Sequence, residues 1–293
     1  MSVRFADAPP LRSASAFLGT AVALAVLALV AFAGLYAAAV GIPFWATIDN
    51  NAIVGVEPAQ APLVHRATES LLETISVLSI ALFGFVIAAL AFARRRADLG
   101  VGCLMVIAAA NLSAQLLKPA LGRIDLTGAD SLRTLSGAYP SGHATVAASL
   151  AVALVLVAPP RLRPVAVVGG AAYAAAVGVA LVLAGWHYPS DVAGAYLLVL
   201  AWACLVAALT GARARGRNGR HGGTAVSPVL AALILGALLT VVVIAAAPRA
   251  EQILSAIRVE TTFVLAAAAI AGLAAVVVGG FAALVARSPL DAG

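Results

Sequence analysis

The chain has 293 residues, of which 63% are apolar and only 10% are charged, and its mean hydropathy is +1.07. Soluble domains carry about 25% charged residues, so this composition excludes a soluble enzyme, a disordered protein and a small disulfide-rich secreted domain. The net charge of +6 comes without any aromatic-interleaved basic patch, so we expect no nucleic-acid partner. Cys103 and Cys204 lie in apolar stretches without metal-ligand spacing, which predicts two buried thiols.

Eight stretches are apolar enough to cross a bilayer, which takes about 20 residues. They are roughly 15–40, 71–93, 99–117, 143–158, 165–184, 188–210, 228–247 and 262–286. The first is longer than the apolar core of a signal peptide, so we interpret it as an uncleaved span. Backbone groups in hydrocarbon must be paired within their own segment, and the runs lack the two-residue alternation of barrel strands. The predicted fold is an all-α polytopic membrane bundle of about eight transmembrane helices.

The basic residues predict the orientation. If the N-terminus is cytoplasmic, twelve of the 18 basic residues fall on the inner side, and every inner connection is basic, as the positive-inside rule requires. We therefore expect a multi-pass cell-membrane protein with both termini in the cytoplasm. The predicted parts are an N-terminal tail (1–14), a six-span membrane domain (15–210), a basic cytoplasmic linker (211–227) and a C-terminal two-span extension (228–293).

A first polar group closes the third span. Asn111, Gln115, Lys118 and Gly122 are spaced to share one helical face, if the helix continues past Lys118, and Arg123 follows them. Pro119 predicts a kink or a helix end at this point. Such a stripe on an apolar helix faces a bundle interior or a water-filled cavity. The alternative is hydrogen bonding between helices together with an interfacial lysine.

A second group, Tyr139-Pro140-Ser141-Gly142-His143, precedes the fourth span. Ser141 is placed as an N-cap, and the free N–H groups and positive dipole end of the first turn form an anion site. Gly142 lets the backbone approach a ligand closely. An ordinary capped helix start is the alternative interpretation.

A third group, Trp186-His187-Tyr188-Pro189-Ser190-Asp191, lies between the fifth and sixth spans. If Pro189 begins the next helix, His187 and Asp191 approach each other over about one turn. The carboxylate then fixes the imidazole tautomer and leaves the other ring nitrogen as a nucleophile or base. The alternative is an interfacial aromatic belt with an incidental histidine–aspartate pair.

On the predicted topology the three groups lie at one depth, on the outer side. Two imidazoles, a carboxylate, cations and a helix N-terminus form a set suited to handling phosphate. No carboxylate cluster suits Mg²⁺, and no third histidine accompanies His143 and His187 to suit Zn²⁺, so we expect chemistry without a metal or other cofactor.

These residues resemble the type 2 phosphatidic acid phosphatase superfamily of membrane lipid phosphatases. The resemblance rests on Lys118 with Arg123, on PSGH at 140–143 and on H-x-x-x-D at 187–191, in matching order and depth. It covers about residues 70–210. It implies a six-helix phosphatase-like core that includes the first span, and it leaves the last two spans unexplained.

The resemblance also implies roles for these residues. His187 attacks phosphorus and forms a phosphohistidine, Asp191 orients and charge-stabilises it, and His143 protonates the leaving alkoxide before water releases phosphate. The residues implied to bind phosphate are Lys118, Arg123, Ser141 and Gly142.

Two positions depart from the family pattern. Asp125 stands where an arginine is usual, and Ala180-Leu181 stands where Ser-Arg is usual, which removes two phosphate-binding cations. Arg123 offsets one of them, and Arg133 in the same outer loop is a further candidate.

The predicted function is an integral membrane phosphatase that acts on a lipid phosphate or diphosphate from the outer leaflet, with membrane lipids around it. A close variant is a phosphotransferase that passes the phosphoryl group to a hydroxyl other than water. Two other classes are a non-catalytic lipid-phosphate binder or transporter, which the missing arginines favour, and an intramembrane serine hydrolase using Ser141. The sequence determines neither the headgroup nor the oligomeric state.

Overall fold

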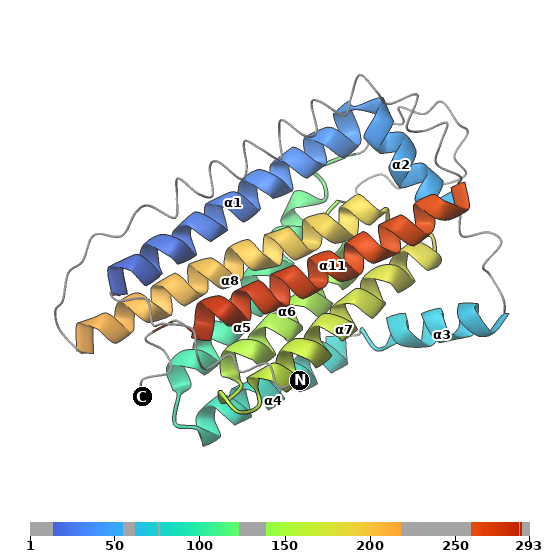
Figure 1. The fold of residues 1–293 in the computed structure, drawn as a ribbon. Coiled ribbons are helices and arrows are strands. Elements are labelled where there is room, and N and C mark those ends of the chain that lie inside the picture. Colours follow the sequence, from blue (N-terminus) through green and yellow to red (C-terminus); the bar gives the residue numbers. More distant parts are fainter. Residues whose placement is uncertain are drawn as a thin grey trace.

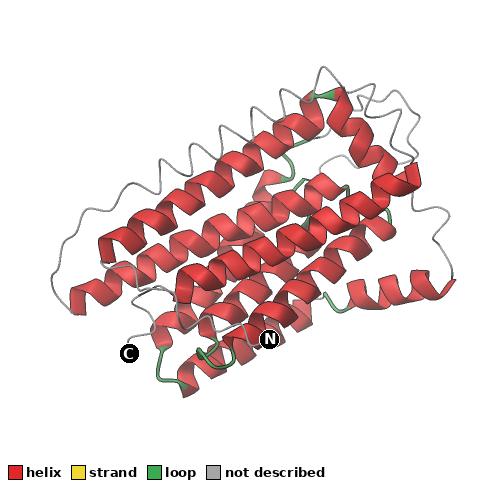
Figure 2. Ribbon diagram, viewed as in Figure 1, coloured by secondary structure: helices red, strands yellow, loops and turns green. Residues whose placement is uncertain are grey.

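The computed structural model describes residues 14–54, 62–75, 77–122, 139–217, 259–286 and 288. Every regular element within those residues is a helix (Figure 2). The helices are α1 (Ala14–Gly41), α2 (Pro43–Val54), α3 (Pro62–Glu73), α4 (Val77–Ala93), α5 (Ala97–Leu117), α6 (Gly142–Val157), α7 (Arg163–Leu183), α8 (Pro189–Arg217) and α11 (Val259–Ala286). The predicted all-α fold is confirmed.

Among the described residues, five helices are long and apolar enough to cross a membrane, namely α1, α5, α7, α8 and α11, and α4 and α6 contain shorter apolar helices. The protein is a multi-pass membrane protein. The predicted span 228–247 lies outside the described residues. Helix α8 continues to Arg217, into the stretch predicted as a linker.

The predicted second span, 71–93, is not one helix. Helix α3 ends at Glu73, a turn follows, and the apolar helix α4 begins at Val77. The reason is composition, because α3 carries the charged residues Arg66, Glu69 and Glu73, which are costly to place in hydrocarbon. The short helix α2 was also not predicted. It begins at Pro43, a residue well suited to the first position of a helix.

Helix α6 is the innermost element. It is buried along nearly its whole length and packs against α5, α7, α8 and α11. Small residues allow this close packing: a Cβ added at Gly170 of α7 would lie 3.0 Å from the Cβ of Ala151 of α6.

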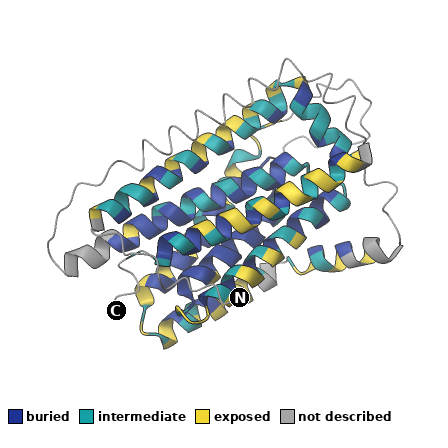
Figure 3. Ribbon diagram, viewed as in Figure 1, coloured by how far each residue is buried: buried dark blue, intermediate teal, exposed yellow. Residues whose placement is uncertain are grey.

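The outer helices present apolar side chains to their surroundings. Helix α1 lies along α8, and α11 packs on α7 and α8, as seen in Figure 1. Figure 3 shows buried faces turned toward the middle of the bundle and exposed faces turned outward. Phe85 and Phe92 of α4 are 71% and 80% exposed. Such side chains suit contact with lipid tails.

The two ends of the bundle differ in chemistry. At one end Arg94, between α4 and α5, donates a hydrogen bond from Nη1 to the carbonyl of Val157, the last residue of α6. Arg163 at the start of α7 donates to the carbonyl of Ala158 at 3.4 Å. These arginines, predicted to be cytoplasmic, thus share one end. The start of α6, with Ser141 and His143, lies at the other. Which membrane face each end meets stays a prediction.

Candidate active site

Three segments that are distant in sequence come together where α6 begins. The backbone N–H of Ser141 donates to the backbone carbonyl of Asp191 at 3.1 Å, which ties the start of α6 to the start of α8. The ammonium nitrogen of Lys118 lies 3.2 Å from the point that a Cβ on Gly142 would occupy. His143 lies within electrostatic range of both Lys118 and His187. Residues from each of the three predicted groups therefore lie in one cluster.

Lys118 stands where α5 stops. The helix ends at Leu117 and does not continue past Lys118, since Pro119 has no N–H to extend the ladder. Gly122 therefore does not share a helical face with Lys118, as the spacing had allowed. Its carbonyl instead accepts a hydrogen bond from the hydroxyl of Tyr36 in α1 at 2.8 Å.

The rest of the polar stripe on α5 divides into two parts. The amide of Asn111 donates to the hydroxyl of Ser149 in α6 at 3.1 Å, a hydrogen bond between helices. The amide nitrogen of Gln115, one turn further along, lies 3.4 Å from the Cβ point of Gly142. Hydrogen bonding between helices therefore describes Asn111, whereas Gln115 is exposed and lies beside the start of α6.

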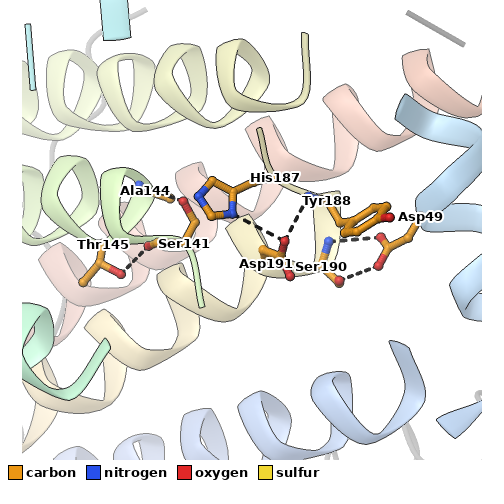
Figure 4. Close-up of polar contacts among 8 residues, drawn as sticks. All are labelled: Asp49, Ser141, Ala144, Thr145, His187, Tyr188, Ser190 and Asp191. Carbon is orange, nitrogen blue, oxygen red and sulfur yellow. Dashed lines mark hydrogen bonds and ion pairs between the residues drawn. The ribbon is translucent and has the colours of Figure 1, made fainter. Parts of the chain in front are cut away.

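Ser141 is the N-cap of α6. Its hydroxyl oxygen accepts a hydrogen bond from the backbone N–H of Ala144 at 3.3 Å, and its carbonyl accepts one from the hydroxyl of Thr145 at 2.7 Å (Figure 4). The side chain is fully buried. This capping geometry sets the direction of the first turn of α6, and a buried cap is poorly placed to act as the nucleophile of a serine hydrolase.

Tyr139 anchors the loop before α6. Its hydroxyl donates to the carbonyl of Phe32 in α1 at 2.7 Å, and the side chain is fully buried. Its ring lies directly over Gly194 of α8, where a Cβ would come within 2.4 Å of a ring carbon. The loop is therefore held between α1 and α8, and Ser141 stays hydrogen-bonded to the start of α8.

The chain reverses sharply between α7 and α8. Gly185 takes the left-handed conformation with φ 65°, and the N–H of Trp186 donates to the carbonyl of Leu181 at 3.0 Å. This is the hydrogen-bonded helix ending for which glycine is preferred. Pro189 then begins α8, as predicted, and His187 lies in the short connection.

His187 and Asp191 face each other across the first turn of α8. Nδ1 of His187 lies 3.5 Å from Oδ2 of Asp191, and the same oxygen accepts a hydrogen bond from the N–H of Tyr188 at 3.0 Å. Asp191 is fully buried, whereas the His187 side chain retains 12% exposure. Because Nδ1 faces the carboxylate, Nε2 on the far side of the ring is the nitrogen directed away from it (Figure 4).

His143 lies in the first turn of α6 and is partly buried. Its ring centroid is 5.7 Å from that of Trp186, the residue before His187. Trp186 is thus more than a member of an aromatic belt, since it contacts the second histidine of the cluster.

Three of the residues discussed in the sequence analysis lie outside the part of the chain that the structure describes. Arg123, Asp125 and Arg133 lie outside the described residues. Ala180 and Leu181, where the family usually has Ser-Arg, are buried in the apolar core. Within the described ranges, no three histidine, cysteine, aspartate or glutamate side chains gather as metal ligands would.

The sequence analysis did not single out Asp49. This α2 residue is 5% exposed, and its carboxylate accepts hydrogen bonds from both the backbone N–H and the hydroxyl of Ser190, the neighbour of Asp191. The two partners are 141 residues apart, and no motif joins them. The available signal was an isolated acidic residue directly after an apolar run.

Replacing Gly142 by alanine tests the contact with Lys118. The new Cβ would meet only the flexible ends of Lys118 and Gln115, so the fold should persist while the ammonium group is displaced. We expect inorganic phosphate to inhibit the variant about tenfold more weakly, a change of about 1.4 kcal/mol, with an unchanged melting temperature. The matched control is Gly169→Ala in α7, where nothing lies within 4 Å of the added Cβ. Equal phosphate inhibition in Gly142→Ala and wild type would remove Lys118 from the phosphate site.

A family model described as the PAP2 superfamily matches residues 100–215, which include Lys118, the start of α6 and the His187–Asp191 pair. The resemblance inferred from the motifs is confirmed. No curated protein matches the chain.

One solved structure that matches is described as the first transmembrane PAP2 type phosphatidylglycerolphosphate phosphatase from Bacillus subtilis. The two chains are 21% identical with a TM-score of 0.53, and the match covers 68% of this chain and 98% of the other. The chain therefore has the fold of a transmembrane PAP2-type phosphatase.

Proposed function

We propose that this chain, whose residues 100–215 match the PAP2 superfamily, is a metal-independent membrane phosphatase that hydrolyses a lipid phosphate or diphosphate through a phosphohistidine. The observation that carries the proposal is the buried carboxylate of Asp191 beside Nδ1 of His187, with His143 and Lys118 in the same cluster. A site that only bound phosphate would not need an imidazole oriented by a carboxylate.

In the first step Nε2 of His187 attacks phosphorus, and the bond from phosphorus to the lipid oxygen breaks. Asp191 stabilises the positive charge that develops on the imidazole. His143, protonated, gives its proton to the leaving alkoxide and so releases the lipid alcohol. Lys118 and the N–H groups at the start of α6 hold the phosphoryl oxygens, where positioning and charge supply most of the rate enhancement.

In the second step water attacks the phosphorus of the phosphohistidine. His143, now neutral, accepts a proton from that water, the bond from phosphorus to nitrogen breaks, and inorganic phosphate leaves. His187 returns to its starting state. The net reaction converts a lipid phosphate and water into a lipid alcohol and phosphate.

A lipid substrate fits the position of the site. The cluster lies where three apolar helices, α5, α6 and α8, begin or end, so a headgroup can reach it while the tail stays among apolar side chains. The arginines at the opposite end support a cytoplasmic position for that end and an extracytoplasmic one for the site. The phosphatase named for the structural neighbour makes phosphatidylglycerol phosphate one candidate substrate.

Purified protein should release inorganic phosphate from at least one member of a panel of phosphatidic acid, phosphatidylglycerol phosphate, a polyprenyl phosphate and a polyprenyl diphosphate. The rate should not change when EDTA is added, because the proposed reaction uses no metal. Phosphate assays with and without EDTA check both points. Loss of activity with EDTA would contradict the mechanism, lipid binding without release would favour a binder, and ³²P transfer to an added alcohol would identify a phosphotransferase.

A further inference from the structure

We propose that Asp49 is a positioning residue for the His187–Asp191 pair and acts through the first turn of α8. This inference rests on the proposed function. Asp49 belongs to α2, outside the segment that matches the family model, and its carboxylate accepts hydrogen bonds from Ser190.

The contact joins a carboxylate of one helix to the N-terminus of another. One carboxylate oxygen of Asp49 accepts the N–H of Ser190 at 3.1 Å, and the other accepts the hydroxyl of the same serine (Figure 4). Both residues are buried, so solvent screens this interaction little.

Ser190 lies in the first turn of α8, directly before Asp191, so its contact with Asp49 bears on the position of that turn. The first N–H groups of a helix have no partner within it, and Pro189 has no N–H at all. Asp49 satisfies the N–H of Ser190 and places negative charge at the positive end of the α8 dipole. Ser190 precedes Asp191 directly, so a shift of this turn moves the carboxylate that faces His187.

The carboxylate of Asp49 lies beside an apolar cavity of about 710 Å³ between α1, α2, α8 and α11. The N-terminus of a helix is capped well by a neutral side chain. A charged acceptor that binds Ser190 through both carboxylate oxygens fixes the first turn of α8 in position and direction. Misplacing a catalytic group such as Asp191 by about 1 Å can lower the rate about 100-fold.

The test uses Asp49→Ala, Asp49→Asn and Ser190→Ala in the full chain. We expect Asp49→Ala to lower kcat about 100-fold with little change in KM or in inhibition by inorganic phosphate, because Lys118 and Gly142 are untouched. Asp49→Asn keeps an oxygen that can accept the Ser190 N–H, so its kcat should be about tenfold higher than that of Asp49→Ala. Ser190→Ala should fall between Asp49→Ala and wild type.

The matched control is Ser113→Ala. Like Ser190→Ala, it removes one serine hydroxyl that joins α8 to a neighbouring helix, since Ser113 of α5 accepts from Trp202 at 3.0 Å. Trp202 lies about 18 Å further along α8, so kcat should stay at the wild-type value.

An Asp49→Ala variant with wild-type kcat would overturn the proposal, as would equal losses of kcat in Ser190→Ala and Ser113→Ala. Phosphate inhibition that weakens as much as kcat falls would also overturn it, because Asp49 would then act on binding. A wild-type protein that releases no phosphate overturns the proposed function and the role of Asp49 together, whereas an active wild type with an unaffected Asp49→Ala overturns the role of Asp49 alone.

Discussion

Replacing His187 by alanine should abolish phosphate release from every lipid phosphate that the wild-type protein hydrolyses. In the proposed mechanism the bond to phosphorus forms on this imidazole, and loss of a catalytic nucleophile costs on the order of 10⁶-fold in kcat. The fold should persist, because the hydrogen bond that His187 makes to Leu181 uses its backbone N–H. Phosphate release and a thermal melt measure the two expectations.

Trapping the covalent intermediate tests the role of His187 as the nucleophile more directly. Wild-type protein quenched during turnover of a ³²P-labelled lipid phosphate should carry acid-labile label, and His187→Ala should carry none. A variant that melts with the wild type yet keeps activity within a few-fold would show that His187 is not the nucleophile. Label retained in that variant would place the covalent bond on another residue.

Replacing Asp191 by asparagine should lower kcat by about 10³- to 10⁴-fold, a loss like that seen when the aspartate of a catalytic triad becomes an amide. The asparagine oxygen can still accept the N–H of Tyr188, so the first turn of α8 should form. Its NH₂ group, however, cannot stabilise positive charge on His187 and favours the wrong tautomer. Steady-state kinetics should show the loss in kcat with KM little changed.

Asp98→Asn is the matched control for this substitution. Asp98 also lies in the first turn of its helix, α5, where it pairs with Arg96 at 3.1 Å. Lys118 closes the same helix about 30 Å away, so neutralising Asp98 should leave kcat at the wild-type value. Equal activity of Asp191→Asn and Asp98→Asn would show that the buried carboxylate beside His187 has no part in the reaction.

Local rules predicted much of the site correctly. Ser141 caps α6 and Pro189 begins α8, both of which follow from the preferences of helix ends. The approach of His187 to Asp191 depends on only four residues of chain, so it too is a local property. The end of α5 at Leu117 also agrees with a local rule, because Pro119 predicted a kink or helix end there and Gly122 shared the face only if the helix continued.

The same local rules could not predict contacts between segments that are distant in the sequence. Asn111 and Gln115 lie one turn apart on α5, but only the packing of α6 decides that the first binds Ser149 and the second lies at Gly142. Asp49 is the clearest case, because its partner is 141 residues away and the intervening chain has no motif that relates them.

The sequence by itself determined that the chain is a helical membrane bundle and that it carries motifs resembling those of the PAP2 superfamily, because hydrocarbon forces apolar runs into helices and motifs are short-range patterns. Tertiary structure decided which polar side chains meet and that α2 supplies a carboxylate to the start of α8. These features depend on the packing of side chains brought together from distant parts of the chain, and residue spacing along one helix does not specify that packing.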